Sequence, residues 1–390
     1  MHIKFLGFLH QNMAGIYIHI PFCKQACHYC DFHFSTSLKY KAEILEAIRQ
    51  EINIQKQFLG NEMIETIYFG GGTPSLLSAD EINRIVDTVR ENFIISDKNE
   101  ITLEANPDDL TLQKIKELRN TPINRFSVGI QSFYDEDLKW MNRAHNSNEA
   151  EFSVKALQDA GFENITIDLI YGYPLLTDEK WKANIKTTID LEIPHISCYS
   201  MTVEPQTALA TFINKGKQKA MDEAQSASQF IYLMEELTTN GFEHYEISNF
   251  AKPGKHSKHN TNYWKGVKYL GIGPSAHSFD GQNRQWNLAN NMGYLSALAK
   301  KEIPAEKEIL SAKDKLNEYI MTSLRTMWGL SLQHVKDHFD NDLANKIKEE
   351  ASPFFEKEWL KTNENTIYLT QNGKLYADHI ASELFIEDEF

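Results

Sequence analysis

The sequence has few cysteines, and their distribution excludes a secreted scaffold held together by disulfides. Only four occur in 390 residues, and three of them, Cys23, Cys27 and Cys30, fall within eight consecutive positions. Clustered thiols of this kind indicate metal chemistry in a reducing compartment. Long apolar runs are also missing, since the stretch from residue 5 to residue 9 is too short to span a bilayer and lacks the flanks of a signal peptide. We therefore predict a cytoplasmic protein.

Basic clusters are absent as well. The chain has 40 Lys and Arg against 54 Asp and Glu, which gives a net charge of −14. Such an acidic balance, with the closing stretch ELFIEDEF, repels phosphate and excludes nucleic acid as the main partner. The length and the 42% of hydrophobic residues suffice for one large domain and a smaller appendage.

From residue 16 onward a short β-branched run, a polar or glycine-rich turn and a helix-periodic segment alternate six times. This alternation predicts an α/β fold with a parallel sheet. The sheet should form a partial (β/α)6 barrel of TIM-like type, two βα units short of a closed eight-stranded barrel. Helix starts at Ser78 and Asn146 are marked by capping boxes with Glu81 and Glu149. The predicted strands are 16–20, 66–69, 101–104, 125–130, 165–170 and 195–201.

Four segments follow from the pattern. Residues 1–14 form an N-terminal extension, and the sequence does not decide whether translation starts at Met1 or Met13. Residues 15–225 form the partial barrel. Residues 226–310 extend it with a helix, a strand-like segment HYEISNFA and a loop reaching to about residue 292. Residues 311–390 form a small α+β domain of winged-helix type.

The cysteines have the spacing C-x3-C-x2-C in a loop directly after the first strand. Three thiolates hold three irons of a [4Fe–4S] cluster and leave one iron open to another ligand. The alternative is a zinc site completed by His28 or His19. The fourth cysteine, Cys198, lies in a strand and is expected to be a small buried hydrophobic residue.

Other polar or glycine residues also gather where predicted strands end, and functional loops of parallel barrels lie at that edge. Each taken alone fits an ordinary turn glycine or a polar strand end. Their joint placement favours a shared site. They are Gly70 to Gly72 after the second strand, Glu104 ending the third, Gln131 after the fourth and Asp168 late in the fifth.

Nine segments between Gly15 and Phe385 carry a resemblance to a known family. They are GIYIHIPFCKQACHYCDF, YFGGGTPS, ITLEANPDD, RFSVGIQSF, NRAHN, IDLIYGYP, HYEISNFA, HNTNYW and GIGPSAHS. With them the chain resembles the HemN/HemW branch of the radical-SAM superfamily, and within it the heme chaperones. The resemblance implies a [4Fe–4S] cluster on Cys23, Cys27 and Cys30, S-adenosylmethionine (SAM) at its open iron, and a HemN-type C-terminal domain.

The resemblance also implies individual SAM contacts. Bare glycine backbone suits the SAM amino group, carboxylates suit ammonium or hydroxyl groups, and a guanidinium suits the SAM carboxylate. Taken alone, Tyr17 could equally be an aromatic residue at the mouth of the barrel. Each polar side chain could equally be a solvated surface residue or a member of a structural ion pair. The implied SAM residues are Tyr17, Gly71, Gly72, Thr73, Glu104, Gln131, Arg143 and Asp168.

Two features separate a chaperone from an enzyme in this branch. Coproporphyrinogen dehydrogenases of the HemN type have a further cysteine where this chain has Phe32, and a long N-terminal arm where it has 16 residues before Tyr17. The segment HNTNYW matches a heme-associated motif, which implies heme contacts at His259, Tyr263 and Trp264. The alternative is a loop whose aromatic residues fill the core. Whether His259 ligates iron, or His256 or His277 does, stays open.

We therefore predict a heme chaperone, not an enzyme, that passes heme to acceptor proteins such as membrane-bound respiratory enzymes. This prediction also implies a peripheral position at the membrane and an electron donor. The competing prediction is an enzyme that converts coproporphyrinogen III to protoporphyrinogen IX. The sequence leaves the acceptor, the donor, SAM cleavage and a homodimer undecided.

Overall fold

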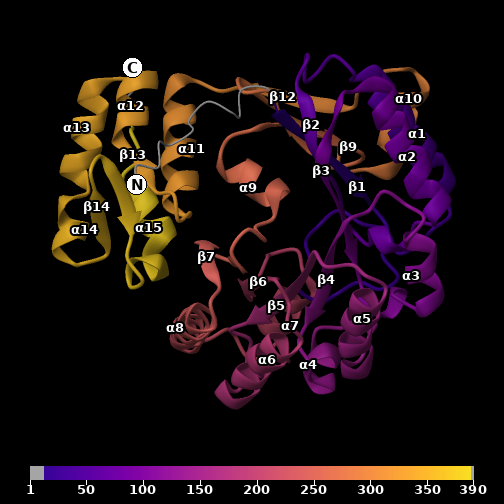
Figure 1. Cartoon of the computed structure of the whole chain (residues 1–390), viewed down its shortest axis with the longest axis horizontal. Coiled ribbons are helices and arrows are strands. Elements are labelled where there is room, and N and C mark those ends of the chain that lie inside the picture. Colours follow the sequence, from indigo (N-terminus) through magenta and orange to yellow (C-terminus); the bar gives the residue numbers. More distant parts are fainter. Residues whose placement is uncertain (1–12, 388–390) are drawn as a thin grey trace.

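The computed structural model describes residues 13–387, and six consecutive strands form the centre of its main sheet (Figure 1). Each strand pairs in parallel with the next one in sequence, which confirms the predicted α/β fold with a partial barrel. They are β1 (Met13–Ile20), β2 (Met63–Gly71), β3 (Ile95–Ala105), β4 (Arg125–Gln131), β5 (Ile165–Tyr171) and β6 (His195–Ser200).

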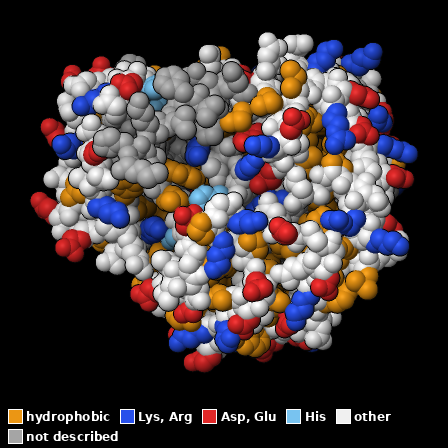
Figure 2. All heavy atoms as spheres, in the orientation of Figure 1, with side chains coloured by type: hydrophobic (Ala, Val, Ile, Leu, Met, Phe, Trp, Pro, Cys, Tyr) orange, Lys and Arg blue, Asp and Glu red, His pale blue; other side chains and the backbone are white. Residues whose placement is uncertain are grey.

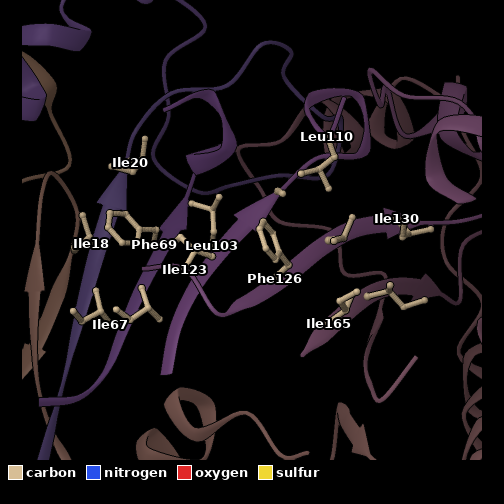
Figure 3. Close-up of a cluster of buried hydrophobic side chains, with 14 of the residues drawn as sticks. Ile18, Ile20, Ile67, Phe69, Leu103, Leu110, Ile123, Phe126, Ile130 and Ile165 are labelled. Atoms are coloured by element: carbon tan, nitrogen blue, oxygen red, sulfur yellow. The ribbon is translucent and has the colours of Figure 1, made fainter. Parts of the chain in front are cut away.

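Helices cover the outer face of these strands because every second strand residue there is apolar. Figure 3 shows Ile18, Ile20, Phe69, Leu103 and Phe126 packed side by side from four neighbouring strands, all of them buried. Both predicted capping boxes are present, at the starts of α2 and α5. The covering helices are α1 (Lys41–Ile54), α2 (Ala79–Asn92), α3 (Leu112–Leu118), α4 (Asp135–Trp140), α5 (Ser147–Asp159) and α6 (Asp178–Asp190).

The segment after β6 is more regular than predicted. The expected loop to about residue 292 is wrong, because three strands and a helix lie within it, and β9 pairs in parallel with the outer side of β1. These strands are short, partly polar and antiparallel beyond β9, so they give no long apolar run to recognise. The elements are α7 (Ala208–Asn214), α8 (Glu223–Thr239), β7 (Glu243–Glu246), β8 (Asn249–Ala251), α9 (Lys258–Trp264), β9 (Lys268–Ile272), β10 (His277–Phe279), β11 (Asn283–Asn287), α10 (Asn291–Ala299) and β12 (Ala305–Ile309).

The C-terminal part has its own core, built on Leu316, Ile320, Val335 and Ile347, and stands beside the sheet in Figure 1. The order of helix, short strand, three further helices and hairpin is of the winged-helix type, so the predicted small α+β domain is confirmed. Within residues 13–387 every helix is too short or too polar to cross a bilayer. The elements are α11 (Ala312–Leu324), β13 (Leu330–Ser331), α12 (Leu332–His338), α13 (Asn341–Glu350), α14 (Ser352–Glu356), β14 (Leu360–Asn363), β15 (Thr366–Leu369) and α15 (Ala377–Glu383).

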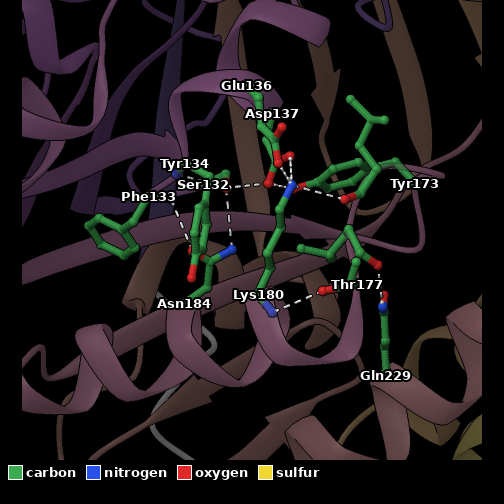
Figure 4. A network of polar contacts seen from close by, with 12 residues as sticks. Ser132, Phe133, Tyr134, Glu136, Asp137, Tyr173, Thr177, Lys180, Asn184 and Gln229 are labelled. Atoms are coloured by element: carbon green, nitrogen blue, oxygen red, sulfur yellow. Dashed lines mark hydrogen bonds and ion pairs between the residues drawn. The ribbon is translucent and has the colours of Figure 1, made fainter.

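A buried polar network fixes the loop that follows β4 (Figure 4). The fully buried carboxylate of Asp137 accepts hydrogen bonds from Ser132 at 3.0 Å, from the Tyr173 hydroxyl at 2.8 Å and from Lys180 at 3.0 Å. A buried carboxylate is stable only when it is paired and hydrogen-bonded in this way. The network ties the ends of β4 and β5 to α6, and it therefore holds Gln131 at a fixed place on the edge of the barrel.

Candidate cofactor site

A cavity of about 460 Å³ opens at the carboxyl ends of the parallel strands, and we call it the cysteine cavity. Loops at that edge of a parallel barrel converge on one point, so residues far apart in sequence meet there. Its wall holds the three clustered cysteines and most of the predicted SAM residues. Those are Cys23, Cys27, Cys30, Gly71, Gly72, Thr73, Glu104, Gln131, Arg143 and Asp168.

The cysteine loop is held by backbone bonds rather than by regular structure. The Cys23 amide donates to the Ser35 carbonyl at 3.1 Å, and the His28 amide donates to Met141 at 3.1 Å. Burial raises the pKa of Cys30 to about 11 and raises the pKa of Cys23 as well. Iron ions placed beside these thiols would favour the thiolate form, which is the form that binds metal. The donor set therefore fits a cluster.

The zinc alternative has less support from the geometry. Among residues 13–387 no three His, Cys, Asp or Glu side chains converge closely enough to hold a single metal ion. Of the two suggested fourth ligands, His19 has both ring nitrogens engaged and His28 has one engaged. His28 hydrogen-bonds to the Trp140 carbonyl at 2.9 Å, and both ring nitrogens of His19 are taken, by Tyr17 and by the His33 carbonyl.

The glycine loop after β2 is shaped by its own neighbours. Gly71 has a φ of +102°, and a Cβ there would lie 2.5 Å from the His19 ring. A Cβ on Gly72 would lie 2.6 Å from the Phe22 carbonyl oxygen, to which the Thr73 amide donates. Glycine is therefore needed so that this loop can pack against the start of the cysteine loop, in addition to the predicted approach of SAM.

Two carboxyl groups lie on the inner wall of the cysteine cavity. Glu104 accepts hydrogen bonds from the Tyr68 hydroxyl at 2.8 Å and from the Gly71 amide at 3.2 Å. Loss of bulk water and the nearby Asp168 raise the pKa of Glu104 to about 7. Burial also raises the pKa of Asp168 to about 6, despite its contact with Ser127. A cationic ligand would restore the charged form of both groups.

Arg143 is the cation of the site. It donates to the Cys27 sulfur at 3.4 Å, to the Gly129 carbonyl at 2.9 Å and to Asn106. Its Nε is buried without a hydrogen-bond partner among the described residues, which leaves one donor unmet. A guanidinium with a spare donor beside the cysteine loop fits a bound carboxylate, so the residues present fit SAM as well as the cluster.

Several residues of the cysteine cavity were not predicted. Tyr68 and Asn106 make direct hydrogen bonds to predicted residues, and Ser127 and Tyr199 are among the other residues of the wall. Asn106 could have been found, because it follows Glu104 by two positions at the end of the same strand. Tyr68 was missed because its neighbours in sequence look like an ordinary apolar strand.

Tyr17 lies elsewhere. It lines a second cavity of about 1080 Å³ between the sheet and the C-terminal domain, which we call the interdomain cavity. Its ring lies behind Gly70, where a Cβ would come within 2.8 Å of it. Phe32 is shared by the walls of both cavities. A contact of Tyr17 with SAM stays a prediction, and in this structure the residue belongs to the boundary between the two spaces.

The heme-associated segment forms the short helix α9, which lies between the barrel and the C-terminal domain in Figure 1. His259 is 2% exposed, and its ring nitrogens hydrogen-bond with Thr66 and with the Tyr263 hydroxyl, each at 2.8 Å. In this arrangement neither nitrogen is available to iron. Tyr263 and Trp264 do line the interdomain cavity, so the segment supplies aromatic surface there.

A buried carboxylate fixes this helix. Glu100 accepts the backbone amides of Lys258 and His259, each at 3.1 Å, and lies 3.8 Å from the guanidinium of Arg125. An acidic group at a helix start satisfies amides that have no partner within the helix. His259 also stacks on Tyr68, with ring centroids 4.9 Å apart. It therefore forms part of the wall between the two cavities.

Comparison with known proteins agrees with this geometry. Residues 17–187 match the model of the radical SAM superfamily, and residues 310–376 match the HemN C-terminal domain. The chain is 33% identical to the heme chaperone HemW of Bacillus subtilis, over 94% of this chain and 98% of the relative. It is 34% identical to heme chaperone HemW of Lactococcus lactis, over 97% and 99%.

The chain belongs to the HemW family of radical-SAM proteins. Membership of this superfamily implies a [4Fe–4S] cluster and SAM as cofactors. A solved structure of coproporphyrinogen III oxidase (HemN) from Escherichia coli has the same fold, with a TM-score of 0.83 over 96% of this chain and 90% of that one. Its sequence identity of 23% supports no statement beyond the fold.

Proposed function

We propose that this protein is a heme chaperone, which binds heme and passes it to acceptor proteins. The observation that carries the proposal is the interdomain cavity, which is larger than the cysteine cavity and is lined by Tyr263 and Trp264 of the heme-associated segment. Flat aromatic side chains pack well on a porphyrin ring. The names of the HemW relatives point to the same activity.

The cysteine cavity serves the cofactors in this proposal. Cys23, Cys27 and Cys30 would hold the cluster, and the guanidinium of Arg143 would pair with the SAM carboxylate. Glu104 takes up the SAM ammonium, while Asp168 and Gln131 hydrogen-bond to the ribose. When bound, cluster and SAM together supply one-electron chemistry, with the electron coming from an external donor.

An enzyme acting on coproporphyrinogen III is the competing function. Phe32 stands where HemN-type enzymes have a further cysteine, and it is 67% exposed on the rim shared by both cavities. A phenyl ring there offers contact area but no thiol chemistry. The chaperone hypothesis therefore explains Phe32 better than the enzyme hypothesis does. As acceptors of the heme we propose membrane-bound respiratory enzymes.

Delivery of heme is tested with heme-loaded protein and membranes from cells that make no heme. A chaperone hands its cargo over in a complex, so the rate of heme transfer should rise with the amount of membrane protein and exceed the rate of passive loss. Apomyoglobin in excess, added instead of membranes, measures that passive loss. A transfer rate equal to passive loss at every membrane concentration would contradict delivery.

A further inference from the structure

The interdomain cavity has a charge opposite to that of the whole protein. Among the described residues of its wall, the cations are Lys265, Arg284 and Lys315 and the one carboxylate is that of Glu318, although the chain has a net charge of −14. Arg284 lies 2.9 Å from Glu318, and its Nε is buried with no partner among residues 13–387. A local excess of cations attracts an anionic ligand into the cavity.

The cavity also presents imidazole rings from two sides. His277 comes from strand β10 of the sheet, and His334 comes from helix α12 of the C-terminal domain. Figure 2 shows histidine and hydrophobic side chains exposed between the two parts of the molecule. The described residues offer no hydrogen bond to the ring nitrogens of either histidine, whereas His19 and His259 have both nitrogens engaged. His277 and His334 can therefore ligate a metal without losing a bond.

Stacking keeps His334 in place. Its ring stacks on His338 with centroids 4.1 Å apart and meets the Tyr319 ring at a tilt of 34° with centroids 4.3 Å apart. The Nδ1 of His338 hydrogen-bonds to the His334 carbonyl at 3.1 Å, so that second ring is already anchored to the backbone. A ring held by two neighbouring rings loses little entropy when it binds iron, which favours His334 as a ligand.

Taken together, the cavity offers aromatic walls, two unengaged imidazoles and a cationic rim. Its volume of about 1080 Å³ is slightly above the range of about 300–1,000 Å³ that is usual for cofactor pockets, so a ligand as large as heme fits. We infer that the interdomain cavity is the heme site, with His277 and His334 as iron ligands and Arg284 and Lys315 pairing with the two propionates. This inference rests on the proposed heme-carrying function and gives it a site different from His259.

The ligand assignment is tested by titrating hemin into the full-length, anaerobically reconstituted protein. Wild type should give a six-coordinate low-spin spectrum, and His277→Ala or His334→Ala alone should give a five-coordinate one. The double variant should bind hemin at least about tenfold more weakly, since even outer partners of metal ligands are worth about that much. Added imidazole should restore the low-spin spectrum of His334→Gly, which separates a ligand role from a folding role.

Two other histidine variants serve as matched controls for the ligand assignment. His379→Ala removes a histidine of α15 that is not on the cavity wall and should change nothing. His259→Ala should retain the low-spin spectrum. If the His277 and His334 variants keep the wild-type spectrum and affinity, or if His259→Ala alone loses the low-spin spectrum, the assignment is overturned while heme binding stands. If wild type takes up no hemin, the proposed function itself fails.

The propionate contacts are tested with two probes. Arg284→Gln combined with Lys315→Gln should weaken hemin binding by about tenfold or more, because charge-assisted hydrogen bonds are lost. Hemin dimethyl ester has no carboxylates, so its affinity should be the same for wild type and variant. Equal weakening for both probes would contradict propionate pairing and indicate a general loss of the cavity.

Discussion

Cys27→Ala is expected to remove the iron–sulfur cluster while leaving heme uptake intact. Two cysteines cannot hold a cubane that needs three thiolates, so iron should fall from about four atoms per chain to almost none. SAM is expected at the open iron of the cluster, and Cys27 also accepts a hydrogen bond from Arg143, so the variant should lose SAM binding as well. Iron and sulfide content, the absorbance of the cluster and SAM binding after anaerobic reconstitution measure the effect.

Cys198→Ala is the matched control. This residue is 1% exposed within β6, as expected from the sequence, and is not on the wall of either cavity. The change should lower the free energy of unfolding by about 1 kcal/mol through lost packing, and it should leave the cluster in place. A cluster that survives in Cys27→Ala, or disappears in Cys198→Ala, would refute the assigned ligands.

Glu104 is expected to make SAM affinity depend on pH. Its pKa is raised to about 7, mainly by burial, and an ammonium group prefers the ionised carboxylate. Binding should therefore release protons near pH 7, and affinity should rise between pH 6 and pH 8. Glu104→Gln should weaken binding about ten- to a hundredfold and flatten the pH dependence. Calorimetry in two buffers of different ionisation enthalpy measures the released protons.

The same shift has a consequence for stability without SAM. The folded pKa lies above the unfolded value of 4.5, so the folded state binds more protons between about pH 4.5 and pH 7. The contribution of Glu104 to the free energy of unfolding is therefore fully present below pH 4.5 and is lost as the pH rises through 7. Glu104→Gln should abolish this decrease in stability with rising pH, whereas Glu151→Gln on the exposed face of α5 should leave the decrease unchanged. Proton uptake on SAM binding would contradict the account.

Much of the barrel could be predicted because its strands bury both faces. Runs such as IYIHI and ITIDLI are recognisable from composition alone, and each ends at the edge where the chemistry lies. This is why Glu104, Gln131 and Asp168, which are distant in sequence, were expected together and do line one cavity. Their exact partners, such as the Tyr68 hydroxyl, depend on register and could not be predicted.

The interdomain cavity could not be predicted, because it depends on elements that leave weak sequence signals. Strand β9 joins the outer side of β1 in parallel, where Tyr17 is paired with Tyr68 on one side and with Gly271 on the other. Tyr17 therefore stands between the two cavities. His259 was expected near heme, but Thr66, 193 residues away, engages its ring. Only the folded chain brings these two residues together.

The central claim, that the protein carries heme and does not transform porphyrinogens, is tested most directly by one paired measurement on the reconstituted protein. Hemin uptake and conversion of coproporphyrinogen III are followed in parallel, with SAM and a reductant present. We predict about one heme per chain, bound to the folded protein, and no protoporphyrinogen IX. Repeated turnover of coproporphyrinogen III with matching consumption of SAM would contradict the account.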